Sequence, residues 1–262
     1  MTEEPDELDD SRAPLLEHLA ELRRRLIWSF AALFAAFLVC LYFSRDILAF
    51  LVHPLKVAGQ GRIIYTEIFE AFFVELKVAF FAGLMISFPV IANQLWQFVA
   101  PGLYRKEKRA LLPFLLATPI LFLMGASLAY FVAIPLALHY LLSFSGDLGG
   151  LNQEALPAIG SYLSFVMQFL FGFGAAFLLP VLLMLMERAG IVTRPQLVSF
   201  RRYAIVVNTG IAAVLSPPDV GSMLLMAVPL VILYEFALIG IWFTERRRAK
   251  IGDPAQAIIP QG

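Results

Sequence analysis

The sequence predicts an all-α polytopic membrane protein with six transmembrane helices, the last two short, and with both chain ends in the cytoplasm. The 262 residues are 60% apolar and only 15% charged, whereas about a quarter of the residues in soluble domains are charged. Apolar stretches near the roughly 20 residues that cross about 30 Å of hydrocarbon as a helix also recur along the chain. Lipid is therefore the solvent of most of this protein.

The apolar segments are residues 26–43, 78–99, 111–136, 162–186, 203–215 and 223–243. They divide the chain into a cytoplasmic N-terminal segment (1–25) with an amphipathic helix, a transmembrane domain (26–243) and a cytoplasmic tail (244–262). The fifth segment has 13 residues and rises only about 20 Å. The prolines after it reverse the chain, because each lacks a backbone donor. The last two segments thus form a short hairpin, whose exoplasmic end is a candidate partner surface.

The basic residues predict the orientation. Sixteen of the 20 lysines and arginines lie before the first segment, in the second and fourth connections or in the tail, and the third and fifth connections have none. The positive-inside rule makes the basic side cytoplasmic. The first connection is nearly balanced in charge. Within it, one helical face formed by Ile68, Phe69, Phe72, Phe73 and Leu76 predicts a short amphipathic helix at the interface.

The residue inventory argues against an enzyme. Cys40 is the only cysteine, so an intrachain disulfide and a C-x-x-C motif are excluded. The three histidines, His18, His53 and His139, are scattered, and we expect each to be structural. Metalloprotease and serine-protease motifs, an intramembrane aspartate pair and a P-loop are missing from the sequence. We expect no metal and no cofactor.

Two stretches on the cytoplasmic side combine carboxylates with cations. Residues 15–26 read as an amphipathic helix continuous with the first span. By spacing alone, Glu21 is an ordinary i,i+4 partner of Arg25, worth a few tenths of a kcal/mol. Glu107 is one carboxylate among four cations, and composition does not distinguish it from a solvated counter-ion of a positive-inside anchor.

Few polar residues lie within the spans. Those that stand out are Gln94, Gln168, Asn208 and Glu235. A carboxylate inside a membrane is costly and usually functional, so Glu235 is suspect. The alternative is that it reaches cytoplasmic water or Arg246, and the two interpretations have about equal weight.

Several unrelated stretches between about Leu15 and Arg248 form an ordered set of motifs. They are H-L-x-E-L-R-x-R-L within 16–26, E-A-F-F at 70–73 with Lys77, Q-L-W-Q-F-V-A-P-G-L-Y at 94–104 followed by Glu107, Y-F at 130–131 with Pro135, Y-L-S-F-V at 162–166, and S-P-P-D at 216–219. With these stretches in this order, the chain resembles the TatC family, the receptor subunit of the twin-arginine protein translocase.

The resemblance implies a cup-shaped, six-span protein in the bacterial plasma (inner) membrane. Such a protein binds the signal peptides of folded precursor proteins that carry paired arginines. It assembles with the single-span subunits TatA and TatB for Sec-independent export driven by the proton-motive force. We also expect self-association in a receptor complex and contact with the lipid bilayer, and no nucleic-acid partner.

The resemblance also implies site residues. Family carboxylates that read the arginines match Glu21 and Glu107, and the chemistry fits because a guanidinium fork pairs with a carboxylate better than lysine does. Phe98, Arg23 and Arg105 are expected to line the same signal-peptide site. A second set is expected to have structural or partner contacts: Pro54, Glu70, Gln94, Tyr130, Gln168, Ser216, Pro217, Pro218, Asp219 and Met223.

One position departs from the family. Many members carry a glutamate just before the Leu-Pro or Val-Pro that matches Leu179-Pro180, whereas this chain has Leu178. A proton-linked role is therefore not expected there. Gln168, three turns earlier, is expected to supply polarity to the concave face without titrating.

Two rival classes of function fit the residues less well. A six-span secondary transporter of small solutes predicts an internal repeat and several ionisable residues near the midplane. The two halves differ in span length, and Glu235 is the only acid within a span. An intramembrane enzyme is disfavoured by the residue inventory.

Overall fold

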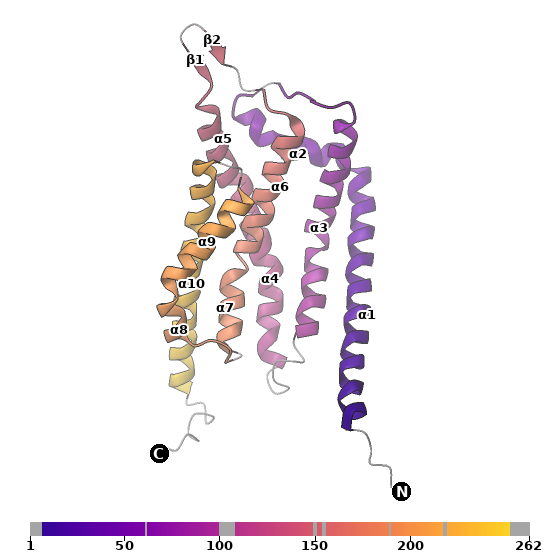
Figure 1. Cartoon of the computed structure of the whole chain (residues 1–262), viewed down its shortest axis with the longest axis vertical. Helices are drawn as coiled ribbons and strands as arrows, with labels where there is room; N and C mark the ends of the chain where they lie inside the picture. The colour runs from indigo at the N-terminus through magenta and orange to yellow at the C-terminus, as the bar shows by residue number, and fades with distance from the viewer. Residues whose placement is uncertain are drawn as a thin grey trace. The chain divides into compact units, whose positions relative to one another are not determined.

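The computed structural model describes residues 7–60, 62–99, 108–148, 151–153, 156–188, 190–216 and 219–251. Helices dominate it (Figure 1). In chain order the elements are α1 (Glu7–Tyr42), α2 (Ser44–Val57), α3 (Glu70–Val99), α4 (Lys108–Leu128), the π-helical turn η2 (Ala129–Ala133), α5 (Ile134–Leu142), β1 (Gly146–Leu148), β2 (Leu151–Gln153), α6 (Ile159–Ala176), α7 (Leu179–Arg188), α8 (Arg194–Ser199), α9 (Arg201–Leu215) and α10 (Val220–Ile251).

The chain forms two compact units. The first unit comprises residues 1–51 and 65–119, and the second unit comprises residues 52–64 and 120–262. Helices α2 and α4 each begin in the first unit and end in the second.

In the first unit, α1 and α3 pack side by side (Figure 1). Gly83 of α3 permits this close approach, because a Cβ atom there would lie 2.9 Å from both the Cα and the backbone nitrogen of Phe37. The Phe37 and Phe80 rings meet edge to face at 6.3 Å between centroids. Within Leu19–Tyr42 of α1, only 6% of the apolar window is buried. Its exposed apolar side chains suit contact with lipid.

The second unit has a continuous aromatic core along α6. Phe165, Phe169 and Phe173 lie one turn apart, and their rings follow one another at 4.5 Å and 5.9 Å between centroids. A second cluster joins Leu197 of α8 to Tyr234, Leu238 and Ile241 of α10. The Tyr234 hydroxyl donates a hydrogen bond of 2.8 Å to the Leu197 carbonyl, which satisfies a polar group among apolar neighbours.

Short extended segments complete the second unit. Strands β1 and β2 pair antiparallel as a hairpin, with Asp147 opposite Asn152. Ile64 forms a single parallel bridge with Ala158. The Ile159 amide donates to the Ile64 carbonyl at 3.0 Å. This bridge ties the first connection to the start of α6.

Five helical stretches among the described residues are long and apolar enough to span a membrane. They are Leu19–Tyr42, Glu70–Phe98, Ala117–Leu142, Ile159–Arg188 and Val220–Arg246. Each corresponds to one of the predicted segments. The remaining segment is α9, with 15 residues, or about 22 Å of helix. The predicted fold of apolar helices is therefore confirmed, with β1 and β2 as the strands among the described residues, and so is the shortness of the fifth segment.

The sixth segment is not short, and that part of the prediction is wrong. Helix α10 has 32 residues, because the Thr-Glu-Arg-Arg-Arg run after Phe243 contains no helix breaker and continues the helix beyond the apolar stretch. The hairpin thus has one short arm and one long arm.

The first connection also differs from the prediction. Among the described residues no separate helix forms around Phe72. Phe72, Phe73 and Leu76 lie in the first two turns of α3, which continues to Val99. Ile68 and Phe69 lie in the turn before this helix. The connection instead contains α2, which the apolar pattern did not predict. Helix α2 continues past Pro54, with apolar residues such as Leu51 and Leu55 buried.

Two of the predicted spans are interrupted. The third passes through the π-helical turn η2, and Pro135 lies at the start of α5. The fourth breaks between α6 and α7 at Phe177 and Leu178, directly before Pro180. Proline removes a helical hydrogen bond and disfavours helix at the preceding residue. Pro135 and Pro180 thus lie next to the interruptions in these two spans.

Candidate functional site

Of the five residues expected at the signal-peptide site, Glu21, Arg23 and Phe98 are described, whereas Arg105 and Glu107 lie outside the described residues. Glu21 and Arg23 are on α1, and Phe98 is in the last turn of α3. Because α1 and α3 pack against each other in the first unit, these two helices can build one site.

Glu21 is paired with Arg25, one turn further along α1. The Nε and Nη2 atoms of Arg25 both donate to Oε1 of Glu21, the former at 3.1 Å. The side chains retain 14% exposure for Arg25 and 28% for Glu21. The i,i+4 pair expected from spacing is therefore present. It is more sheltered than the solvated surface pairs on which the estimate of a few tenths of a kcal/mol rests.

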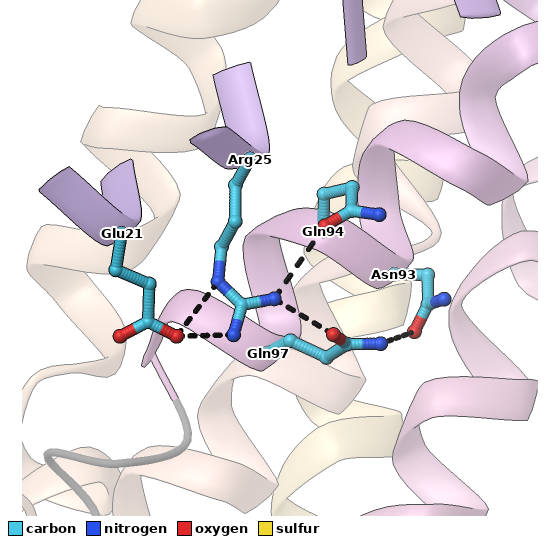
Figure 2. A network of polar contacts seen from close by, with 5 residues as sticks. All are labelled: Glu21, Arg25, Asn93, Gln94 and Gln97. Atoms are coloured by element: carbon cyan, nitrogen blue, oxygen red, sulfur yellow. Dashed lines mark hydrogen bonds and ion pairs between the residues drawn. The ribbon is translucent and has the colours of Figure 1, made fainter. Parts of the chain in front are cut away.

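Arg25 also crosses to α3, as Figure 2 shows. Its Nη1 donates to Oε1 of Gln97 at 2.7 Å and to Oε1 of Gln94 at 3.4 Å. The Gln97 amide in turn donates to Oδ1 of Asn93 at 3.0 Å. The result is a polar network between α1 and α3, with one guanidinium at its centre.

The planar guanidinium suits this network because its five donors point in fixed directions. The guanidinium donates at once to a carboxylate on one side and to two amide oxygens on the other. The compact ammonium group of lysine could not reach both sides together. Gln94, predicted to have a structural or partner contact, makes an internal contact here. Gln97 and Asn93 were not among the predicted site residues, although polar residues at positions 93, 94 and 97 near the end of an apolar helix were a readable signal.

The neighbouring side chains of α1 have other surroundings. Arg23 and Arg24 are exposed, and so are Leu19, Leu22 and Leu26. The exposure of these leucines suits a helix at a membrane surface. Arg25 differs from the two preceding arginines in being held between two helices.

Phe98 is half-buried and directly follows Gln97 at the end of α3. This end is fixed by Trp96, whose Nε1 donates to Oγ1 of Thr118 on α4 at 2.9 Å. Thr118 is itself buried. The tie restrains the end of α3 next to the polar network.

Glu70 and Pro54 have structural contacts. Oε2 of Glu70 accepts hydrogen bonds from the Thr66 amide at 2.5 Å, the Thr66 hydroxyl at 3.0 Å and the Glu67 amide at 3.3 Å. This carboxylate thus satisfies backbone donors before α3 begins. Pro54 is buried within α2. Ile68, in the turn before α3, is 93% exposed.

Three residues of the middle spans have contrasting places. Tyr130 is buried in η2, where one extra residue widens the helical turn. Gln168 is exposed on α6, and Leu178 lies half-buried at the break between α6 and α7. The position of the missing family glutamate is therefore a helix break.

The end of the α9–α10 hairpin contains a polar cluster. Oδ1 of Asp219 accepts the Ser222 amide at 2.7 Å, and the Met223 amide donates to the Asp219 carbonyl at 3.2 Å. Asp219 therefore caps α10. Within the part of the chain that the structure describes, the Ser216 and Ser222 hydroxyls and Oδ2 of Asp219 are buried without a hydrogen-bond partner. Pro217 and Pro218 lie outside the described residues.

Glu235 is neutralised by Arg201, at the start of α9. The Arg201 Nη2 to Glu235 Oε2 distance is 2.8 Å, and the side chains are 50% and 42% exposed. The suggested partner Arg246 instead places its guanidinium 3.9 Å from the centroid of the Trp242 ring. Asn208 is buried and donates to the Leu230 carbonyl at 3.4 Å. Both polar residues thus join α9 to α10.

Among the described side chains there is no group of three or more His, Cys, Asp or Glu residues placed to hold a metal ion. The polar constellations at Arg25, Asp219 and Glu235 are hydrogen-bonded networks and ion pairs.

Comparison with known proteins agrees with the family resemblance. The family model described as Sec-independent protein translocase protein (TatC) matches residues 17–229. The protein of that name from Magnetococcus marinus is 44% identical over 243 residues, covering 92% of this chain and 88% of the relative. The relative from Aquifex aeolicus is 39% identical over 241 residues, covering 91% of this chain and 98% of the relative. The relative from Escherichia coli K12 is 38% identical over 234 residues, covering 88% of each chain.

Solved structures are similar as well. Two crystal structures of the twin-arginine translocase receptor TatC, one of them in DDM, align with a TM-score of 0.76. They are 38% and 39% identical in sequence, and the alignments cover 85% of this chain and 96% and 98% of the solved chains. From its family match and these relatives, the chain belongs to the TatC family of Sec-independent protein translocase proteins and is a multi-pass membrane component of protein transport.

Proposed function

We propose that this chain is the receptor subunit that recognises twin-arginine signal peptides of folded precursor proteins. It acts in the bacterial plasma membrane, with both chain ends in the cytoplasm, and has no enzymatic activity of its own. It assembles with TatA and TatB for export driven by the proton-motive force. Similarity to two crystal structures of a twin-arginine translocase receptor supports this proposal.

The observation that carries the proposal is the geometry at Glu21. Its carboxylate already accepts two donors of one guanidinium, in a partly sheltered position between α1 and α3. A carboxylate held in this way is suited to an arginine of a peptide, since charge-assisted bonds to a guanidinium are both stronger and more directional than neutral ones. Phe98, Arg23, Arg105 and Glu107 complete the proposed site.

The α9–α10 hairpin is the proposed contact for the single-span subunits. Helix α9 is too short to cross an undistorted bilayer, so it either thins the membrane or needs cover from protein. Among the residues that the structure describes, the buried hydroxyl of Ser216, at the end of the same helix, has no hydrogen-bond partner. A polar group without a partner in a membrane favours contact with a polar group of another helix.

Alanine substitution of the two carboxylates tests the peptide site. Glu21→Ala and Glu107→Ala should each weaken binding of a twin-arginine peptide about 10- to 100-fold, the loss expected for a charge-assisted pair. Binding is measured by pull-down from detergent or by crosslinking. Glu67→Ala is the matched control, because that exposed acid lies near the other end of α3. Equal peptide affinity for the wild type and both site variants, with all proteins inserted and folded, would refute the proposal.

The rival function, secondary transport of small solutes, is separated by a transport assay. The chain is expressed in a strain that lacks its own translocase receptor, together with a folded substrate carrying a twin-arginine signal. The proposal expects export of that substrate, and expects none when the two arginines are replaced by glutamines. Export of both forms would contradict signal recognition.

A further inference from the structure

Arg25 already pairs with the Glu21 carboxylate, which in the proposed function binds an arginine of the cargo. Two of its donors are bonded to Oε1 of Glu21, and a third donor is shared between Gln97 and Gln94. All three partners are acceptors that an incoming arginine could also use. An arginine of this chain thus already holds the place of a peptide arginine (Figure 2).

The pairing is built into the helix packing. Only 14% of the Arg25 side chain is exposed, and its acceptors come from both α1 and α3. The close approach of these helices at Gly83 holds the two sides of the network together. Arg24, the preceding residue, is exposed and carries the same charge without joining the network. The chain therefore contains a matched comparison for Arg25.

We infer that Arg25 is an internal competitor of the cargo arginine, which sets the affinity of the site by occupying Glu21 until a signal peptide displaces it. The inference rests on the proposed function of Glu21. Both bonds from Arg25 go to Oε1 of Glu21, and the charge of this carboxylate is already compensated. An incoming guanidinium can therefore pair bidentately with both carboxylate oxygens only by taking over Oε1 from Arg25. The apparent dissociation constant rises by the same factor for every ligand that must displace Arg25.

This arrangement has a consequence for recognition. A weakly matched cation and a paired arginine are both weakened by the same factor, so their ratio of affinities is unchanged. Both absolute affinities are lowered, however. At a concentration where the stronger ligand still occupies the site, the weaker ligand no longer does. Arg25 thus sets the threshold for binding, while the carboxylates supply the preference for arginine.

Peptide binding to the full chain in lipid nanodiscs tests the inference. The probes are three fluorescent peptides, identical except for an Arg-Arg, Lys-Lys or Gln-Gln pair ahead of the same apolar segment. The proteins are the wild type, Arg25→Gln, Arg24→Gln, Glu21→Gln and the double variant Glu21→Gln with Arg25→Gln. We expect Arg25→Gln to bind the Arg-Arg and Lys-Lys peptides about tenfold more tightly, the factor for one released charge-assisted contact.

The controls separate competition from simple charge or access effects. Arg24→Gln removes the same charge at an exposed position and should change affinity less than about twofold. The Gln-Gln peptide should gain nothing, and the gain for Arg-Arg should vanish in the double variant. Unchanged or weaker Arg-Arg binding by Arg25→Gln would overturn the inference, and so would an equal gain for the Gln-Gln peptide.

Failure of the inference is distinguishable from failure of the proposed function. If Glu21→Gln weakens Arg-Arg binding while Arg25→Gln does not tighten it, only the inference is wrong. If Glu21→Gln leaves binding unchanged, the proposed role of Glu21 is wrong. Should Arg25→Gln fail to fold, Arg25→Lys replaces it: this variant keeps the charge but loses the fork, and a gain smaller than tenfold is expected. No gain in a folded Arg25→Lys protein would then overturn the inference.

Discussion

Gly83 is the position where one methyl group should disturb the packing of α1 on α3. In Gly83→Ala the new Cβ would lie 2.9 Å from the Cα and the backbone nitrogen of Phe37 and 3.3 Å from the carbonyl carbon of Ala36. Carbon atoms in favourable contact are about 3.5 to 4.0 Å apart. The helices must therefore separate by several tenths of an ångström, because backbone atoms cannot rotate out of the way as a side chain can.

The change in the free energy of unfolding has two opposing contributions. Overpacking of this kind destabilises the fold by about 1 to 3 kcal/mol, whereas replacing a glycine inside a helix by alanine stabilises the helix by about 0.5 to 1 kcal/mol. The difference is a net loss of about 0 to 2.5 kcal/mol for Gly83→Ala, centred near 1 kcal/mol. For a protein of this size, a loss of about 1 kcal/mol corresponds to a Tm lower by about 2 to 4 °C.

Gly210→Ala is the matched control, since Gly210 is inside α9 and a Cβ there would meet nothing within 4 Å. This variant should gain the helix propensity without the clash, so its Tm should rise by about 1 to 4 °C. Both variants are followed by circular dichroism during heating in detergent. If Gly83→Ala melts at or above the wild-type temperature, the proposed close approach of α1 and α3 is wrong.

Three further predictions concern the second unit. A double-mutant cycle with Arg201→Ala and Glu235→Ala, measured by thermal unfolding, should give a coupling energy of at most about 1 kcal/mol, because both side chains are about half exposed. A coupling energy well above that value would mean that the pair is desolvated. Asp219→Ala should lower stability by about 1 kcal/mol through loss of the cap on Ser222, whereas Asp219→Asn should retain most of it; equal losses in chemical unfolding would refute the capping role. Leu178→Glu should be tolerated at the helix break, as measured by membrane insertion and export of a folded substrate. Loss of either would count against a polar environment at this depth.

Much of the fold could be read from hydropathy, because a membrane span must be both long and apolar. The segments ending near Phe43 and Val99, and the shortness of residues 203–215, followed from this rule alone. The same rule could not find α2, whose apolar face packs within the protein around Leu55, nor the end of α10, where polar residues continue a helix that hydropathy no longer marks.

The site was predictable only in part. The i,i+4 spacing of Glu21 and Arg25 is a property of any helix, so that pair followed from the sequence. The connection from Arg25 to Gln97 spans 72 positions, and the pair of Arg201 with Glu235 spans 34. Periodicity along one helix carries no information about which face of another helix it meets.

The sequence by itself determined the class of the protein, its apolar spans and its family, because these depend on composition, segment length and ordered motifs. Only the tertiary structure decided that Arg25 reaches across to α3, that Glu235 pairs with Arg201, and that the fourth span breaks at Leu178. Each of these depends on how close two helices approach and in which rotation. That approach is set by residues such as Gly83, whose missing side chain has no hydropathy signal but permits the contact.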